Sequence, residues 1–160
     1  MNLNPSNIIC KDKSIHKIRL CDFEYSRKVG DKIYSHTYSQ PFILGFTSPE
    51  LFFFQKQNII SSPVSSYSSS SSTYTSQSSY LGLLVRSSID IFSLGCILYY
   101  LNTKNLLYTT ERELEQLNLT KISEDIEDEQ VSILVKYMVA ETNNERPNIT
   151  QILENSFLIQ

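Results

Sequence analysis

Residues 87–101, SSIDIFSLGCILYYL, contain the longest apolar run of the chain, residues 94–101, and decide its fold. The hydrophobic side chains would point to nearly every side of a helix, which is typical of a helix surrounded by protein. Ser87 or Ser88 is placed to cap the first turn. We therefore predict a buried central helix, since the apolar run is far too short to cross a bilayer.

Shorter elements are expected on both sides of this helix. Two segments rich in Ile and Leu, residues 7–10 and 17–23, flank a polar turn and predict a small hairpin. Residues 25–41 show no clear period and predict a loop. The remaining predicted elements are helices, at residues 49–53, from Thr110 to about Leu117 with a capping box completed by Glu113, at residues 129–140, and after Pro147.

A serine-rich tract interrupts the chain before the central helix. Twelve of the nineteen residues 61–79 are serine, and no charged residue lies between Lys56 and Arg86. Such a tract has too little large apolar surface to offset its ordering entropy. We predict a disordered insertion at about residues 56–86 inside one domain, and a phosphorylated docking segment is the alternative interpretation.

Composition excludes several classes of function. The chain has 160 residues, 41% hydrophobic content and a net charge of −3, with its cationic residues scattered, so a nucleic-acid-binding surface is not expected. Cys10, Cys21 and Cys96 are widely spaced in apolar surroundings, which predicts buried, reduced thiols rather than disulfides or a zinc site. No secretory signal is visible, so we expect a cytoplasmic protein without a membrane segment.

Five segments, taken in order, resemble the C-terminal lobe of a eukaryotic protein kinase. The first three are NLNPSN at residues 2–7, CDFE at 21–24 and GFTSPE at 45–50, similar to the catalytic loop, the metal-binding motif and the end of the activation segment; the central helix and NNERPNITQILENSFL at 143–158 complete the set. Residues 1–160 would then be a partial kinase domain, from the catalytic loop to the last helix. The resemblance implies a mainly α fold with a small β-hairpin, or α+β if a full kinase domain is counted.

The resemblance also implies positions for the chemistry, and several of them hold the wrong residue. Asn2 stands in place of the base aspartate, and Asn4 in place of the lysine that faces the transferring phosphate. An amide cannot take up a proton, and losing a positioned base typically costs about 10²- to 10⁴-fold in rate. Phe42 and Ile43 replace the usual Gly-Thr. These losses predict an inactive site.

Other positions keep the residue type that the resemblance requires. Asn7 and Asp22 match the two magnesium ligands. They could equally only hydrogen-bond the adjacent loops. Glu24 stands where the family has a glycine, shortly after the metal ligand Asp22. Glu50 and Arg146 match a pair that forms a buried salt bridge in the family. Asp90 matches a residue that would accept hydrogen bonds from the catalytic loop.

Five hydroxyl-bearing residues fall in the segment that resembles the activation loop. Another kinase could phosphorylate them. They are Tyr34, Ser35, Thr37, Tyr38 and Ser39. Exposed hydroxyls are common in loops, so plain solvated side chains are the favoured interpretation.

No glycine-rich loop and no strand lysine precede the first motif, so we expect no upper lobe and no cofactor for the chain as given, with Mg²⁺ and ATP only if such a lobe lies upstream. The resulting hypothesis is an inactive, pseudokinase-like lobe that binds proteins. The alternatives are a truncated ATP- and Mg²⁺-dependent serine/threonine kinase and a poorly folding remnant. Within the kinases, the resemblance is closest to the inositol-requiring, unfolded-protein-response sensor type.

Overall fold

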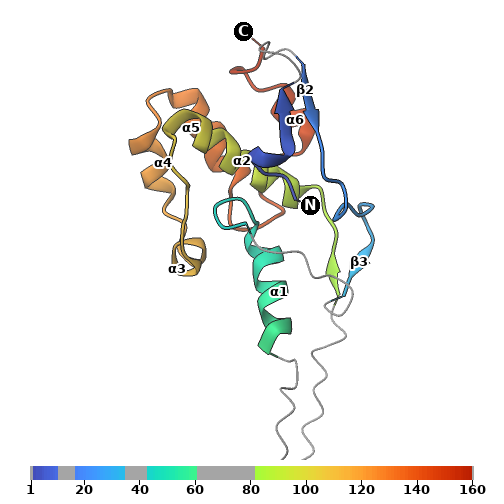
Figure 1. The fold of residues 1–160 in the computed structure, drawn as a ribbon. Helices are drawn as coiled ribbons and strands as arrows, with labels where there is room; N and C mark the ends of the chain where they lie inside the picture. Colours follow the sequence, from blue (N-terminus) through green and yellow to red (C-terminus); the bar gives the residue numbers. More distant parts are fainter. Residues whose placement is uncertain (1, 11–16, 35–42, 61–81, 160) are drawn as a thin grey trace, which may run out of the picture.

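The computed structural model describes residues 2–10, 17–34, 43–60 and 82–159 (Figure 1). This part of the chain is mostly helical with two small antiparallel sheets, which confirms the predicted fold class. In chain order the elements are the 3-10 turn η1 (Pro5–Asn7), β1 (Ile8–Cys10), β2 (Ile18–Leu20), β3 (Lys32–Ile33), α1 (Pro49–Ile60), β4 (Leu83–Leu84), α2 (Ser88–Thr103), α3 (Glu111–Glu115), α4 (Leu119–Asp125), α5 (Glu129–Met138) and α6 (Ile149–Leu153).

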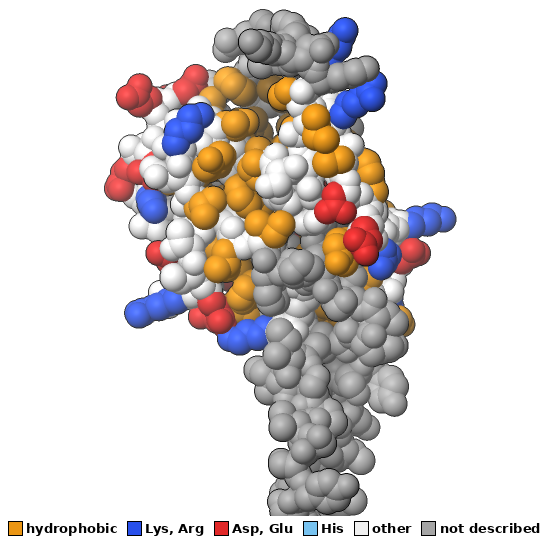
Figure 2. Space-filling model, viewed as in Figure 1, with side chains coloured by type: hydrophobic (Ala, Val, Ile, Leu, Met, Phe, Trp, Pro, Cys, Tyr) orange, Lys and Arg blue, Asp and Glu red, His pale blue; other side chains and the backbone are white. Residues whose placement is uncertain are grey.

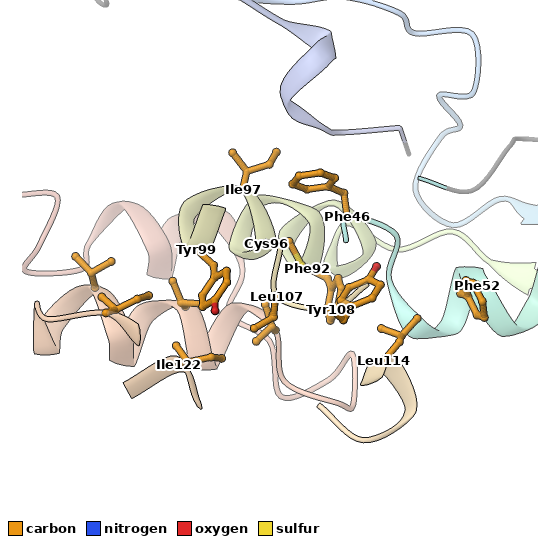
Figure 3. Packing of buried hydrophobic residues seen from close by; sticks show 14 residues of the cluster. Phe46, Phe52, Phe92, Cys96, Ile97, Tyr99, Leu107, Tyr108, Leu114 and Ile122 are labelled. Carbon is orange, nitrogen blue, oxygen red and sulfur yellow. The ribbon is translucent and has the colours of Figure 1, made fainter. Parts of the chain in front are cut away.

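Helix α2 crosses the middle of the molecule, as predicted (Figure 1). In Figure 3, Phe92, Cys96 and Tyr99 point from one side of α2 toward Tyr108 and the α4 residue Ile122. Helix α2 packs most closely on α5. A Cβ atom at Gly95 would lie 2.8 Å from both Met138 Cβ and Val139 Cγ1, so only glycine permits this approach.

Two buried tyrosines join α2 and its following loop to the surrounding elements. The Tyr99 hydroxyl donates a hydrogen bond to the Asp125 carboxylate, and the Tyr108 hydroxyl donates one to the Thr47 carbonyl. Burial, together with the bond to Asp125, raises the pKa of Tyr99 to about 12. Burial likewise raises the pKa of Tyr108 above its usual range.

Because the pKa of Tyr99 is raised in the folded state, we expect stability to fall at alkaline pH. The unfolded chain loses this proton near pH 10, whereas the folded chain holds it until about pH 12. Stability from this group is therefore complete below about pH 10 and is lost as pH rises toward the folded pKa. The check is the urea midpoint from pH 8 to 12 for the wild type, Tyr99→Phe and Tyr137→Phe, an exposed control. Tyr99→Phe should flatten the pH dependence and the control should not; equal curves for all three would contradict the prediction.

Several element boundaries differ from the sequence-based predictions. The hairpin is confirmed, with Ile8 opposite Leu20 and Cys10 opposite Ile18, and the capping box of Thr110 and Glu113 is present. Helix α1 runs to Ile60, well beyond the predicted residues 49–53. Helix α3 ends at Glu115 and α5 at Met138, each two residues short of the prediction. Ser87 is the N-terminal cap of α2, but its side chain makes no capping hydrogen bond.

Helix α4 and the strands β3 and β4 were not predicted. Helix α4 is opened by the Asn118 side chain, which accepts hydrogen bonds from the amides of Thr120 and Lys121. Strands β3 and β4 pair Lys32 with Leu84 and Ile33 with Leu83. The predicted insertion at 56–86 thus has helix at its start and a strand near its end, while residues 61–81 lie outside the described residues.

The prediction of three buried cysteines was wrong for two of them. Cys96 is buried on α2, Cys21 is half-buried and Cys10 is exposed. Cys10 ends β1 in a two-stranded sheet, and the partner strand β2 is itself exposed along its length.

Apolar side chains also lie at the surface. Figure 2 shows hydrophobic side chains gathered over α2 on one face of the molecule. The hairpin residues Ile9, Ile18 and Leu20 and the neighbouring Phe23 are exposed as well. Large contiguous apolar patches mark surfaces that other protein covers. Among the described helices, none has both the length and the apolar character that crossing a bilayer requires.

Candidate functional site

The hairpin brings the two predicted metal-ligand positions together. Its register places Asn7 next to Cys21, whose amide donates to the Asn7 carbonyl at 3.0 Å. Asp22 follows directly. Asn2, Asn7, Asp22 and Asp90 share the lining of a cavity of about 180 Å³, to which Cys21 and Ser26 also contribute.

Asn4, predicted to replace a phosphate-facing lysine, is buried and organises this loop. It is 2% exposed, and its Oδ1 accepts a hydrogen bond from the Ser6 amide at 2.9 Å, which caps η1. A backbone amide can only donate, so the opposite end of the Asn4 side chain must be its NH₂ group. That group donates to the Asn2 carbonyl at 3.0 Å and to Asn2 Oδ1 at 3.2 Å.

The orientation of Asn4 fixes the orientation of Asn2. Because Asn2 Oδ1 faces the Asn4 donor, Asn2 Nδ2 faces the other way and donates to Asp22 Oδ2 at 2.9 Å. Asn7 Nδ2 donates to the Asn2 carbonyl at 2.8 Å and to the same Asp22 oxygen at 3.3 Å. The Asp22 carboxylate is therefore held by two amide donors.

The backbone strain of this site lies at Asp22 rather than at Glu24. Asp22 has φ +60°, a left-handed conformation that Asp and Asn tolerate better than most residues. Glu24 keeps a negative φ, so the backbone here does not require the glycine that the resemblance places at this position. Unfavourable backbone angles often occur at functional sites.

A divalent cation fits poorly at Asp22 Oδ2 with the side chains as they are placed. Magnesium prefers carboxylate and carbonyl oxygens, whereas Asn2 and Asn7 both direct N–H groups at Asp22 Oδ2. A cation at that oxygen would meet the positive ends of two amides. Within the described part of the chain, no group of three His, Cys, Asp or Glu side chains is arranged to hold a metal ion. As placed, Asp22 Oδ2 therefore faces two N–H donors.

Asn2→Asp is expected to destabilise the protein at neutral pH. The substitution removes a donor 2.9 Å from Asp22 and puts a second carboxylate beside the first. The expected loss is on the order of 1 kcal/mol in metal-free buffer. Urea unfolding with EDTA or with added Mg²⁺ measures the effect.

Asn2→Ala is the matched control, since it removes the hydrogen bond without adding charge. Its stability should not respond to Mg²⁺. If Asn2→Asp is as stable as the wild type at pH 7 in EDTA, Asn2 does not lie against Asp22.

Glu50 and Arg146 meet in a bidentate ion pair. Arg146 Nη1 and Nη2 lie 2.7 and 3.0 Å from the two Glu50 carboxylate oxygens. The Arg146 side chain is fully buried, with its guanidinium 4.8 Å from the centre of the Phe92 ring. It also donates to three backbone carbonyls, those of Ser88 at 3.0 Å, Ala140 at 2.8 Å and Glu141 at 3.2 Å. This one side chain therefore connects α1, the start of α2 and the segment after α5.

The other predicted site residues are placed in part. Asp90 lies in the first turn of α2 and lines the cavity beside Asn2 and Asn7. Tyr34 lies just after β3, close to Gly82. Ser35, Thr37, Tyr38 and Ser39 lie outside the described residues.

Sequence reasoning missed the role of Asn4. The resemblance places a phosphate-facing lysine at this position, whereas the Asn4 carboxamide orients Asn2. The available signal was the Asn-Pro pair, because Asn is a favoured cap and Pro is favoured in the first turn of a helix.

The comparison with curated proteins shows what this chain is similar to. It is 31% identical over 116 residues, 72% of its length, to the dual specificity tyrosine-phosphorylation-regulated kinase 2 of Drosophila melanogaster. The chain contains a protein-kinase-like region. The match covers 12% of the relative's length. No family model matches the chain.

The kinase-like region agrees with the general resemblance but not with its finer part. The relative is named as a dual-specificity kinase, and nothing in the comparison points to the inositol-requiring sensor type. That narrower likeness stays a prediction.

Proposed function

We propose that this kinase-like lobe binds proteins and does not transfer phosphate. The observation that carries the proposal is the Asn2 amide donating to Asp22 at 2.9 Å. Asn2 stands in place of the base, and its side chain has no basic site for the substrate proton. Its partner, Asp22, is the residue that resembles a metal ligand.

The surroundings of Asn2 support the absence of transfer. Phosphoryl transfer requires cations that absorb the charge developing on the phosphate. Asn4 is neutral, buried and fully engaged in the loop. Among the residues that line the cavity, the charged ones are Asp22 and Asp90, so the lining is acidic rather than basic.

The retained structural contacts support a role that depends on shape. The Glu50–Arg146 pair and its backbone hydrogen bonds hold three segments in place although the catalytic positions differ. Exposed apolar side chains on the hairpin and over α2 offer surface to a protein partner (Figure 2). A cytoplasmic location suits such a module.

The direct test is a phosphoryl-transfer assay. Purified protein is incubated with radiolabelled ATP, Mg²⁺ and a mixed peptide substrate library, with an active protein kinase as the positive control. We expect no transfer above the enzyme-free blank and no shift of the thermal midpoint with Mg²⁺ and ATP. Transfer that Asn2→Ala abolishes would overturn the proposal.

An ATP- and Mg²⁺-dependent serine/threonine kinase is the second candidate. It is favoured by the 31% identity to a named kinase and by the placement of Asn7 and Asp22 side by side. The same assay on the protein purified at its endogenous length, with the intact mass measured, distinguishes the two. Activity in that preparation but not in the 160-residue chain would assign catalysis to the longer protein.

A further inference from the structure

Helix α5 has two apolar sides, and only one is covered. Val131, Leu134, Val135 and Met138 are buried, and the helix packs against α2 and α4. Its other apolar residues, Ile133 and Tyr137, are 38% and 60% exposed. A surface helix normally presents polar residues on its outer side.

This second side forms the wall of a groove. The hollow has a volume of about 550 Å³ and is lined by Leu119, Ile133, Lys136, Tyr137, Ala140 and Glu145. We call it the α5 groove. Positions 133, 136 and 137 follow the spacing of one face of α5, and Ala140 lies just after its end. The floor is mostly apolar, with Leu119 contributed by the start of α4.

The α5 groove continues at both ends. Leu119 is shared with a hollow of about 170 Å³ that reaches Pro49 and Phe53 on α1. Tyr137 and Glu145 are shared with one of about 330 Å³ beside α6, where Asn144, Gln151 and Asn155 supply amides. Together, the three neighbouring hollows offer an apolar middle and a hydrogen-bonding end. An extended or helical peptide uses both kinds of contact.

The exposed charges that line these three hollows are mainly negative. Glu115 and Glu141 line the α1 end, and Glu145 lies between the middle and the α6 end. All three are exposed, and none forms an ion pair within the described part of the chain. The lysine of the groove, Lys136, donates to the Ser123 hydroxyl. Residues 111–145 carry ten carboxylates and three cationic side chains.

We propose that the α5 groove binds a basic peptide segment of a partner protein, with apolar anchor side chains seated against Ile133 and Tyr137. The proposal rests on the protein-binding function proposed above and names its surface and partner class. Charge complementarity speeds association and selects partners, while buried apolar anchors supply most of the affinity.

The charge pattern disfavours the other occupants. A phosphate-rich nucleic acid would meet the same carboxylates. In a symmetric dimer each groove would face its own copy, because such an interface pairs identical patches. That arrangement would bring two acidic surfaces together.

The test is selection from an unbiased peptide display library on the immobilised protein, followed by fluorescence polarisation with the selected peptides. We expect selected sequences enriched in Lys and Arg around an apolar residue. Ile133→Asp and Tyr137→Ala should each weaken binding at least about ten-fold, and Glu141→Gln with Glu145→Gln should weaken it less. Raising the ionic strength from about 0.05 M to about 0.5 M should also weaken it.

Val29→Asp is the control, because Val29 is an exposed aliphatic residue between β2 and β3, outside both the hairpin and the α5 groove. It should leave affinity unchanged, and circular dichroism should show all variants folded. Selected peptides that are not basic, or whose binding ignores the groove variants, would overturn the proposal while protein binding through another face still stood. Recovery of no binder at all would remove both. A wild-type dimer that Ile133→Asp dissociates would show a second copy in the groove, and would also overturn it.

Discussion

Arg146→Ala is expected to lower the free energy of unfolding by about 3 to 5 kcal/mol, because removing one partner leaves the other charge uncompensated. The Arg146 side chain has no exposed surface, and its loss would leave the Glu50 carboxylate without either guanidinium contact at 2.7 and 3.0 Å. Three backbone carbonyls would lose their donor at the same time. Urea unfolding followed by circular dichroism measures the loss.

Two further variants show that the effect comes from the ion pair. Arg112→Ala removes an exposed arginine on α3 and should change stability by less than about 0.5 kcal/mol. Arg146→Lys keeps the charge but cannot make the bidentate contact, so it should recover only part of the loss. If Arg146→Ala and Arg112→Ala unfold at the same urea concentration, the pair contributes nothing.

Phe92→Ala is expected to cost about 3 to 5 kcal/mol, the usual range for emptying a buried aromatic site. Phe92 is 0% exposed on α2, and its ring meets Tyr108 with a centroid distance of 6.4 Å. The Arg146 guanidinium lies over the Phe92 ring, 4.8 Å from its centre. Unfolding in urea again provides the measurement.

Phe23→Ala is the matched control, with the same change in side chain at a residue that is 64% exposed. It should change stability by less than about 0.5 kcal/mol. The double variant Phe92→Ala with Arg146→Ala should lose less than the sum of the two single losses, since contacting residues are coupled. Strict additivity would show that the ring and the guanidinium do not interact.

Arg146 also connects the scaffold to the proposed binding surface. It lines the hollow beside α6 together with Glu145 and Asn144, at one end of the α5 groove. Loss of the ion pair would therefore disturb that end of the groove as well as stability. The residues that keep the lobe in shape and those that would hold a partner lie next to each other here.

Local patterns predicted the elements whose signals are carried by neighbouring residues. The apolar run of α2 predicted a central helix, and Thr110 with Glu113 predicted a capping box, because both depend on chemistry within a few turns. Helix α4 was missed although Asn118 caps it, because the segment is short and mixed in polarity. Strands β3 and β4 were missed because the two strands pair with each other but are separated in the sequence by the serine tract.

In the candidate site, too, some features follow from residue type alone and others only from tertiary contacts. Residue type alone determined that position 2 carries an amide and that Glu50 and Arg146 have opposite charges. Only the tertiary structure decided that Asn2 points its NH₂ group at Asp22, since that follows from a chain of hydrogen bonds through Asn4 and Ser6.

The sequence by itself determined the central helix, the hairpin, the amide at position 2 and the acidic character of residues 111–145, because composition, periodicity and side-chain chemistry are properties of the chain in any conformation. Only the tertiary structure decided which apolar side of α5 would be covered. Helix α2 can pack closely at Gly95 against one side, while Ile133 and Tyr137 on the other remain exposed. Packing determines which apolar face of a helix becomes buried, and a sequence with two apolar faces does not by itself determine which one that is.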